Sequence, residues 1–390
     1  MSNNFAQGPT TPLLPGAMLG VLGGGQLGRM FAHAATQMGY HVTVLDPAET
    51  GPAAEVATQH LRFAYDDPEG LAELALTCDA VTTEFENVPA DSLRFLQQHI
   101  PVSPPPEAVE VAQSRIREKT FFKNNSVPTN HFALVKRVED IDAAFAQMSG
   151  KAVIKTTQLG YDGKGQRVCD SAAEVREAFL SFRSVECLLE DFIPFDLEVS
   201  VVLARDWKQQ IEVFPLVENQ HCNGILDVCI VPARVSSTVS DKALSIARKL
   251  ADALDYVGVL AVEMFVTGDQ VLVNEIAPRP HNSGHYTLDA TSHSQFDQQV
   301  RTLCGLSAAT VKLHQPVVML NVLGDLVLDE KFSWDILCAD SSSHLHVYGK
   351  HEARAARKMA HVNYLGDSPD ELIARVENLK RSFTEVFSIK

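Results

Sequence analysis

The sequence lacks the features of membrane-spanning, disulfide-stabilised and nucleic-acid-binding proteins. No apolar run approaches the roughly 20 residues that a helix needs to cross a bilayer. The seven cysteines form no CxxC pair and are odd in number, which favours a reducing compartment, so we expect a cytoplasmic protein. The formal net charge is −16, which argues against binding to nucleic acid or to an anionic membrane. An anionic substrate would therefore need a local basic cluster.

The first sixteen residues also lack the basic start and apolar core of a signal or transit peptide, and we expect them to form a disordered tail. The rest has the composition of an ordinary globular protein, with 45% hydrophobic and 21% charged residues. A length of 390 residues predicts two or three domains. We place them at residues 17–113, 114–304 and 305–390.

Alternating strand and helix patterns predict a parallel α/β unit in the first domain, with strands at 19–22, 41–45 and 80–83. A proline-rich segment at 101–106 ends this unit, and a basic helix is expected over 109–123. The central block mixes strands with helices, so we expect an α+β fold there. The last block is expected to hold strands at 317–322 and 344–348 and a helix over 369–387.

Two carboxylates, Glu263 and Glu275, stand at the two ends of a predicted β-hairpin. A three-residue loop centred on Asp269 would place them opposite one another on one face. A two-residue turn would instead pair Glu263 with Asn274 and put the carboxylates on opposite faces. Facing carboxylates repel unless a cation lies between them, so the three-residue loop predicts a shared divalent metal. The alternative is a solvated hairpin edge.

The glycines Gly23, Gly25 and Gly28 satisfy the pattern GxGxxG between a strand and a helix, and Asp46 follows the next strand. In a dinucleotide site such a loop holds the diphosphate and the acidic residue holds a ribose hydroxyl. Glycines also serve tight turns and close helix packing. NAD(P) binding therefore stands as one hypothesis for this motif.

A second glycine-rich run, GYDGKGQ at residues 160–166, lies between two predicted strands. Because no Ser or Thr follows Lys164, it is not a Walker loop, and a β-loop-β flap over a triphosphate explains it better than an ordinary hairpin does. Lys155 ends the preceding strand, where it is placed to reach a phosphate. Residues 190–193 follow another apolar strand and form a candidate hinge for a purine and a ribose.

Flap, lysine, hinge and carboxylate hairpin, in this order, resemble the ATP-grasp ligases. The runs VLGGGQLGRM, EFENVP, GYDGKGQ and NEIAPRPHNSGHYT together resemble the 5-(carboxyamino)imidazole ribonucleotide synthase family of purine biosynthesis, over about residues 20–361. The resemblance implies a Rossmann-like N-terminal domain, an ATP-grasp central domain, a small β-rich C-terminal domain and a homodimer. It also implies ATP and Mg²⁺ as cofactors, with 5-aminoimidazole ribonucleotide and bicarbonate as substrates.

The same resemblance implies a set of site residues. ATP would be bound by Arg115, Lys155, Gly160, Tyr161, Asp162, Gly163, Lys164, Gly165, Gln166, Glu190, Asp191, Phe192, Ile193, Glu198, His221, Asn274 and Glu275. Mg²⁺ would be bound by Glu263 and Glu275. The ribonucleotide would be bound by Tyr161, Asp162, His281, Asn282, Ser283, Lys350, Arg357 and Lys358. Arg279 would act on bicarbonate or carboxyphosphate, and Asp162 or His281 would accept the proton of the substrate amine.

Lys350, Arg354, Arg357 and Lys358 form the basic cluster that an acidic protein needs for a phosphorylated substrate, although a solvated charged face is the alternative. The family pattern has glycine just before the arginine and lysine pair, where this chain has Ala356. Alanine does not readily adopt the positive φ that glycine allows. The sequence therefore leaves open which basic side chain meets the phosphate.

Three other functions are compatible with parts of the sequence. A formate-dependent glycinamide ribonucleotide transformylase would share the ATP-grasp fold and replace bicarbonate by formate. An NAD(P) dehydrogenase would use the first glycine motif, and a catalytically silent nucleotide-binding module would use neither substrate. The presence of Glu263, Glu275, Lys155 and Arg279 argues against the silent module.

Overall fold

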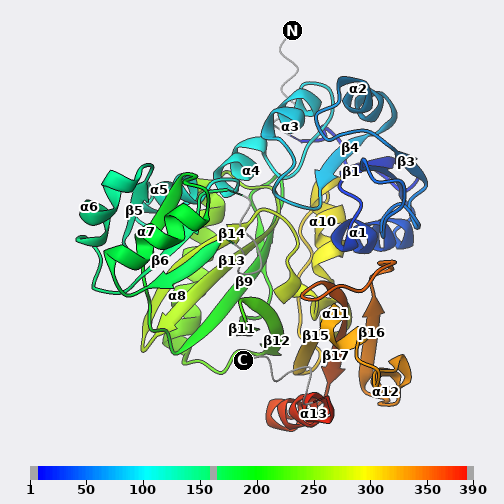
Figure 1. The fold of residues 1–390 in the computed structure, drawn as a ribbon. Coiled ribbons are helices and arrows are strands. Elements are labelled where there is room, and N and C mark those ends of the chain that lie inside the picture. The colour runs from blue at the N-terminus through cyan, green and yellow to red at the C-terminus, as the bar shows by residue number, and fades with distance from the viewer. Residues whose placement is uncertain (1–7, 159–164, 384–390) are drawn as a thin grey trace.

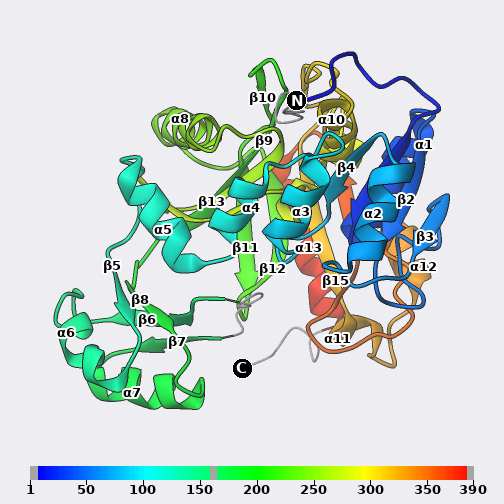
Figure 2. The ribbon, with the colours of Figure 1, turned by 90° about the horizontal axis from the view of Figure 1, so that it is seen from above.

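The structure, a computed structural model, describes residues 8–158 and 165–383. In these residues the chain forms a parallel N-terminal sheet, a small antiparallel sheet and a large sheet (Figure 1). Strands of the central and C-terminal blocks both belong to the large sheet. Figure 2 shows the small sheet and the N-terminal domain on opposite sides of the large sheet. The predicted combination of α/β and α+β folds is confirmed. None of the helices in this part of the chain is both long and apolar enough to cross a bilayer.

The N-terminal sheet has the strand order β3-β2-β1-β4, and its strands are parallel, as predicted. The strands are β1 (Met18–Leu22), β2 (His41–Leu45), β3 (Gln59–Leu61) and β4 (Ala80–Thr83). The helices of this part and the next are α1 (Gln26–Gln37), α2 (Pro68–Thr77), α3 (Ala90–Gln97), α4 (Pro106–Ala112) and α5 (Arg115–Asn124). Asp67 caps α2 through the backbone N–H groups of Glu69 and Gly70, with Pro68 at the first helical position.

The prediction of one basic helix over 109–123 is wrong, because the chain breaks between α4 and α5. The helical path is interrupted at Ser114, which is extended, and the side-chain amide of Gln113 just before it donates to the backbone carbonyl of Glu86 at 2.8 Å. The backbone N–H of Arg115 donates to the carbonyl of Thr157 at 3.0 Å. These long-range hydrogen bonds, which helical periodicity does not reveal, place Arg115 at the first position of α5.

The small sheet has the order β5-β8-β6-β7 and is antiparallel throughout. Its strands are β5 (Phe132–Val135), β6 (Ala152–Thr156), β7 (Gln166–Cys169) and β8 (Cys187–Asp191), with α6 (Ile141–Phe145) and α7 (Ala172–Ser181) packed on it. β6 pairs directly with β7. The predicted β-loop-β arrangement is therefore confirmed for the two strands, whereas residues 159–164 of the loop lie outside the described residues.

The large sheet has the order β14-β13-β9-β11-β12-β15-β17-β16, and β10 pairs with β9. The strands are β9 (Leu197–Arg205), β10 (Ile211–Val213), β11 (Val217–Cys222), β12 (Ile225–Val231), β13 (Gly258–Thr267), β14 (Gln270–Ala277), β15 (Val317–Leu323), β16 (Ser343–Val347) and β17 (Lys358–Leu365). The helices are α8 (Ser237–Ala253), α9 (Thr287–Ala290), α10 (Gln295–Leu303), α11 (Gly324–Val327), α12 (Trp334–Cys338) and α13 (Pro369–Ser382). The C-terminal strands thus continue the sheet of the central block.

The strand β17 was not predicted from the sequence. Its interior is buried without interruption from Met359 to Tyr364, so it shows no polar and apolar alternation. It lies between β15 and β16 and brings Lys358, its first residue, to the end of the large sheet nearest the N-terminal domain.

Candidate functional site

The hairpin of β13 and β14 has the predicted pairing but a different turn. Glu263 pairs with Glu275, as expected for a shared face. The predicted three-residue loop is wrong, because Thr267 pairs with Gln270 and leaves a turn of two residues. The register shifts by one residue beside Glu263, where Asn274 is the extra residue of a β-bulge. The odd residue therefore lies in the strand and not in the loop.

The bulge decides the direction of Glu275. Val271 and Val273 are buried in the core that α8 covers, and in a regular strand Glu275 would point to the same side. Instead Ile276 enters that core, while Glu275 and Glu263 both line the cavity on the opposite face. The carboxylates share a face because the strand contains one additional residue.

Each carboxylate of the pair contacts a basic side chain. The Glu263 carboxylate lies 3.0 Å from Nε2 of His281, and the Glu275 carboxylate accepts a hydrogen bond from Arg115 at 2.8 Å. Burial alone would raise the pKa of Glu263, but the adjacent His281 and the other basic groups nearby lower that pKa to about 2. Glu263 is therefore ionised at neutral pH and able to bind a cation.

The residues of the hairpin fit Mg²⁺, which prefers oxygen ligands. Besides the two carboxylates, Oδ1 of Asn274 is buried and has no hydrogen-bond partner among the described residues. No group of three or more His, Cys, Asp and Glu side chains in residues 8–158 and 165–383 could hold a metal by itself. A site of this kind suits Mg²⁺ that completes its coordination with phosphate and water.

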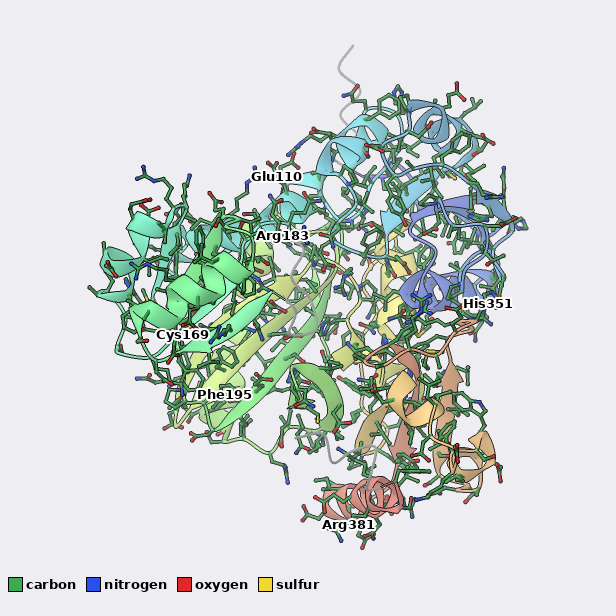
Figure 3. The ribbon with its side chains drawn as sticks, viewed as in Figure 1. Glu110, Cys169, Arg183, Phe195, His351 and Arg381 are labelled. Atoms are coloured by element: carbon green, nitrogen blue, oxygen red, sulfur yellow. The ribbon has the colours of Figure 1, made fainter. Side chains whose placement is uncertain are left out.

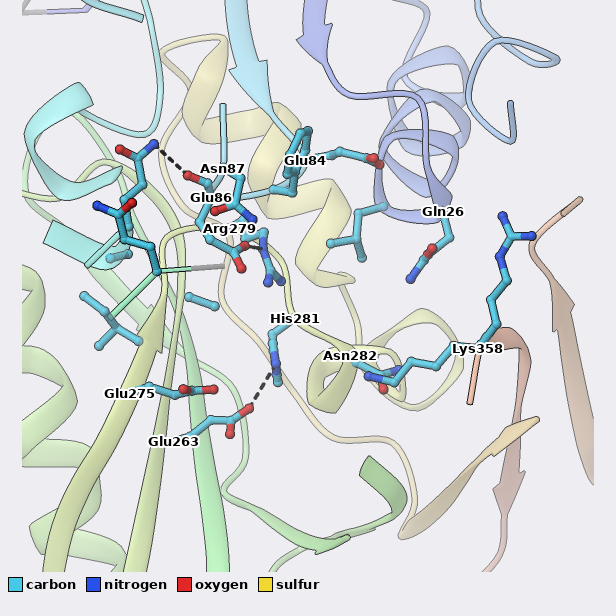
Figure 4. A pocket seen from close by; sticks show the side chains of 18 of the residues that line it. Gln26, Glu84, Glu86, Asn87, Glu263, Glu275, Arg279, His281, Asn282 and Lys358 are labelled. Carbon is cyan, nitrogen blue, oxygen red and sulfur yellow. Dashed lines mark hydrogen bonds and ion pairs between the residues drawn. The ribbon is translucent and has the colours of Figure 1, made fainter. Parts of the chain in front are cut away.

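A cavity of about 610 Å³ begins at this hairpin and extends to the N-terminal and C-terminal domains. Its polar and charged lining residues are Gln26, Glu84, Glu86, Asn87, Gln113, Arg115, Glu118, Thr157, Gln158, Glu263, Glu275, Arg279, His281, Asn282, His285, Lys350, Arg354, Arg357 and Lys358. Figure 4 shows Glu263 and Glu275 side by side and Lys358 on the other side of His281 and Asn282. The cavity is therefore acidic at the hairpin and basic at the C-terminal domain.

Arg279 lies at the middle of this cavity, held by a carboxylate from another domain. Its Nε donates to Glu86 at 2.6 Å, and its Nη1 donates to the carbonyl of Pro280 at 3.1 Å. Burial opposes the charge of Arg279, but the adjacent Glu86 keeps its pKa above the ordinary value. Arg279 is thus a fixed cation a few residues along the chain from Glu275.

His281 is oriented from both ring nitrogens. Nε2 faces Glu263, and Nδ1 lies 2.9 Å from the hydroxyl of Ser283. Ser283 is fully buried, accepts a hydrogen bond from Ser200 at 2.8 Å and is not among the cavity-lining residues. Asn282 does line the cavity, but its amide exchanges two hydrogen bonds with Asn321. Ser283 therefore contacts His281 but does not itself line the cavity, where it was expected.

Lys155 of β6 and Glu190 of β8 form a buried ion pair in the small sheet. Nζ of Lys155 donates to Glu190 at 2.9 Å, and Asn130 donates to the same oxygen at 2.8 Å. Lys119 lies 3.8 Å from it. Burial would raise the pKa of Glu190, but Lys119 and Lys155 lower it to about 2. The second oxygen, Oε1, is buried with no partner among the described residues, so it remains available to a ligand.

The other nucleotide residues predicted from the sequence have partners outside this pair. Glu198 and His221 form an ion pair across β9 and β11. The carboxylate of Asp191 accepts from the backbone N–H of Ser149 at 2.7 Å, so this side chain points to the loop after α6. Phe192 carries Lys151 over its ring at 4.9 Å. Ile193 is half-buried in the segment that connects β8 to β9.

The flap is described only at its ends. Gly165 accepts a hydrogen bond from the backbone N–H of Thr156 at 2.8 Å, and Gln166 begins β7. Gly160, Tyr161, Asp162, Gly163 and Lys164 lie outside the described residues.

The basic loop, residues 350–358, is held by its own backbone and by the N-terminal domain. Nζ of Lys350 donates to the carbonyl of Lys358 at 2.6 Å, and Arg357 donates to the carbonyl of Glu352 at 2.8 Å. His351 lies 3.3 Å from Glu55 of the N-terminal domain, at the edge seen in Figure 3. The predicted cluster of basic side chains is therefore gathered at one wall of the cavity.

Ala356 occupies the left-handed region, with φ of 63°. Its backbone N–H donates to Asp325 at 2.6 Å, which fixes the turn before Arg357. The loop thus keeps the backbone expected of a glycine although the residue is alanine.

The first glycine motif is occupied by side chains of the protein. Asp46 accepts from the backbone N–H of Gly24 at 2.8 Å, and Glu84 accepts from the N–H groups of Gly25 and Gly28 at 2.6 Å each. A Cβ at Gly25 would lie 2.5 Å from Glu84. Because these carboxylates occupy the amides that a diphosphate would need, the geometry argues against a dinucleotide at this helix.

Sequence reasoning assigned no role to Glu84, Glu86 and Glu118, which line the cavity. Glu84 and Glu86 belong to the run EFENVP, which was noted as a motif but carries no chemical pattern of its own. Glu118 lies in α5 among basic residues. Its burial and the charge of Glu275 raise its pKa to about 8. In the sequence, the available signal is a glutamate among basic residues of one helix, and its burial is visible only in the structure.

Family models match three parts of the chain. Residues 17–113 match the ribonucleotide synthetase preATP-grasp domain, and residues 120–296 match the ATP-grasp domain. Residues 317–375 match the phosphoribosylaminoimidazole carboxylase C-terminal domain.

The chain is similar to known proteins over almost its whole length. It is 41% identical to the N5-carboxyaminoimidazole ribonucleotide synthase of Bacillus subtilis, over 94% of this chain and 96% of that protein. A crystal structure of an N5-carboxyaminoimidazole ribonucleotide synthetase with ADP has a TM-score of 0.91 and 43% identity, covering 95% of this chain and 98% of the other. A structure of the Aspergillus clavatus synthase with ADP and 5-aminoimidazole ribonucleotide has a TM-score of 0.86 and 28% identity, covering 96% and 99%.

The pair of Glu190 with its two lysines predicts a pH-dependent contribution to stability. The folded-state pKa of about 2 lies below the ordinary value of 4.5, so ionised Glu190 stabilises the fold above pH 4.5 and ceases to do so as the pH falls toward 2. Glu190→Gln should lower the free energy of unfolding by about 3 kcal/mol at pH 7. Urea unfolding of both proteins without nucleotide should show a smaller difference at pH 3.5, and a difference that grows with acid would contradict this.

The backbone of Ala356 predicts that glycine is better at this position. The left-handed conformation destabilises a folded alanine by roughly 1–2 kcal/mol. Glycine avoids this strain, but it loses more conformational entropy on folding than alanine does, which costs roughly 0.5–1 kcal/mol. We expect Ala356→Gly to raise the free energy of unfolding by up to about 1 kcal/mol. The neighbouring Ala355→Gly, at a residue without positive φ, should lower it. Equal effects of the two changes in chemical denaturation would show that Ala356 carries no strain.

Proposed function

Since this chain belongs to the N5-carboxyaminoimidazole ribonucleotide synthase family of ATP-grasp ligases, we propose that its cavity brings ATP, bicarbonate and 5-aminoimidazole ribonucleotide together. The protein is an ATP-dependent ligase that carboxylates 5-aminoimidazole ribonucleotide in purine biosynthesis. The observation that carries the arrangement is the cavity itself, which has two facing carboxylates at one end and four basic side chains at the other. We place the protein in the cytoplasm as a homodimer.

ATP is proposed to lie between the small sheet and the large sheet. Lys155 and Arg115 would bind the phosphates, and the glycine-rich run between β6 and β7 would cover them. The unpartnered oxygen of Glu190 and the backbone of residues 191–193 are available to adenine, and Glu198 with His221 to the ribose. Glu263, Asn274 and Glu275 would hold Mg²⁺, which offsets phosphate charge during phosphoryl transfer.

The chemistry proceeds in two steps that share an intermediate. A bicarbonate oxygen attacks the γ-phosphorus of ATP, the bond to the β-phosphate oxygen breaks, and carboxyphosphate and ADP are formed. The exocyclic amine then bonds to the carboxyl carbon, directly or after release of CO₂, and phosphate leaves. Arg279 is fixed by Glu86 in the middle of the cavity, where its charge stabilises bicarbonate and carboxyphosphate.

The amine loses a proton when it is carboxylated. His281 is the described candidate to accept it, since Glu263 and Ser283 orient its ring and the ring lines the cavity. Asp162, in the flap, is the other candidate. Closure of the flap would exclude the water that hydrolyses carboxyphosphate.

The ribonucleotide phosphate is proposed to lie at the basic loop. Lys350, Arg354, Arg357 and Lys358 line this end of the cavity, and a phosphate there would be bound by charge-assisted hydrogen bonds. Asn282, held by Asn321, provides a fixed polar surface between the loop and His281.

The proposed reaction determines which substrates should support turnover. Release of ADP should require both 5-aminoimidazole ribonucleotide and bicarbonate, and a coupled ATPase assay in CO₂-depleted buffer measures this. Replacing the pair by glycinamide ribonucleotide and formate should give no turnover above the uncoupled rate. Turnover only with formate would instead identify the formate-dependent transformylase, and binding of NAD(P) without ADP would identify a dehydrogenase.

The proposed Mg²⁺ site requires the charge of the carboxylate pair. Glu275→Gln should lower kcat by roughly 100-fold or more, because it removes a negative oxygen from the proposed Mg²⁺ site without changing the shape of the side chain. Circular dichroism and the melting temperature should stay close to those of the unmodified protein. Asp269→Asn, in the turn of the same hairpin, is the matched control and should leave kcat unchanged. Normal activity of Glu275→Gln would remove the metal assignment.

A further inference from the structure

Among the described residues, β14 is the last strand of the large sheet, so only one of its edges pairs with another strand. The other edge, here called the free edge, carries an isolated bridge between Val273 and Thr129, and it is contacted by α5 and by the segment that precedes β5. A bulged edge strand has irregular backbone groups that need partners from outside the sheet. The free edge of β14 is therefore the place where the position of the bulge can be selected.

The outward-facing groups of Val273 and Ile276, on the two sides of the bulge, are bonded by residues that precede β5 or belong to α5. On one side, Val273 donates its N–H to the carbonyl of Pro128 at 2.8 Å, and its carbonyl accepts from Thr129 at 2.8 Å and from Lys119 at 3.4 Å. On the other side, Ile276 donates its N–H to Glu118 Oε1 at 2.7 Å. Glu118 is 3% exposed and Lys119 is 1% exposed.

The spacing of these contacts matches only the bulged strand. In a regular edge strand the groups that face outward belong to residues two apart, so Val273 and Glu275 would face α5. Here the outward groups belong to Val273 and Ile276, which are three apart. If the bulge were lost, Glu118 would no longer meet the N–H of Ile276, and Glu275 would turn away from Glu263.

We propose that Glu118 is a positioning residue that holds the bulge at Asn274, with Lys119 and Thr129 as its counterparts on the other side. Glu118 acts through the backbone of Ile276, which keeps the Glu275 carboxylate on the cavity face. This role rests on the proposed function, because it assumes that Glu275 binds the Mg²⁺ of Mg·ATP. It gives a reason for a carboxyl group buried so close to Glu275, where burial and the charge of Glu275 raise the pKa of Glu118.

Glu118→Gln and Glu118→Leu separate this role from a direct electrostatic one. Glutamine keeps an oxygen acceptor for Ile276, whereas leucine has a similar volume and no acceptor. We expect Glu118→Leu to raise the Mg²⁺ concentration for half-maximal turnover roughly 10- to 100-fold and to lower kcat, with the KM for the ribonucleotide unchanged. Glu118→Gln should stay within about threefold of the unmodified protein, because the hydrogen bond to Ile276 survives.

Two controls keep the test independent of overall folding. Lys242→Met removes the hydrogen bond from Lys242 to the carbonyl of Asp269, at the turn of the same hairpin, and should leave Mg²⁺ dependence unchanged. Thr129→Val removes one donor to Val273 and should shift Mg²⁺ dependence in the same direction as Glu118→Leu, by less. If Glu118→Leu fails to fold, this second variant decides.

Hydrogen exchange gives a readout without turnover. The amide of Ile276 should exchange faster in Glu118→Leu and at the unmodified rate in Glu118→Gln, and binding of Mg·ADP by calorimetry should weaken only in the former. Equal impairment of both variants, or unchanged exchange in Glu118→Leu, would overturn the proposal. Absence of ribonucleotide-dependent turnover in the unmodified protein would refute the proposed function alone, since exchange and Mg·ADP binding still report on the bulge.

Discussion

The turn of the β13–β14 hairpin would by itself pair Glu263 with Asn274 and send the Glu275 side chain into the core, and the β-bulge at Asn274 prevents this. One additional residue in the strand lets Ile276 fill the core and leaves both carboxylates on the cavity face. Everything else in the site is arranged around this pair. His281 and Arg115 contact its two members, and α5 covers the edge from which the bulge could slip.

The cavity then separates charges of opposite sign over its length. Carboxylates at the hairpin suit a metal bound to polyphosphate, and the basic loop suits the phosphate of the second substrate. Arg279 lies between them. Although the chain has a net charge of −16, four of its 33 lysine and arginine side chains line one end of the cavity, which is where the phosphate of the ribonucleotide is proposed to bind.

The N-terminal domain contributes to this site by supplying carboxylates. Its glycine motif, which in other proteins holds a diphosphate, is closed by Asp46 and Glu84. Glu86 follows at once and fixes Arg279, while Gln113 fixes the backbone of Glu86. The amides of the glycine loop are thus bonded within the N-terminal domain, and the same domain supplies the carboxylate that holds Arg279.

Local sequence patterns were sufficient for the α/β and α+β classes, the parallel N-terminal strands and the strands that border the flap, because each depends on periodicity or on short spacing. The pairing of Glu263 with Glu275 was predicted through a three-residue loop, whereas the strand reaches it through a bulge. Local patterns were insufficient for the break between α4 and α5, for β17 and for the bulge. Gln113 and Arg115, on the two sides of the break at Ser114, bond to residues far away in the chain. β17 is buried on both faces, so it shows no periodicity. The sequence by itself determined the family, because the motifs that carry the resemblance are local runs of residues. Only the tertiary structure decided which face Glu275 occupies, since that depends on partners from α5 at the free edge of a strand.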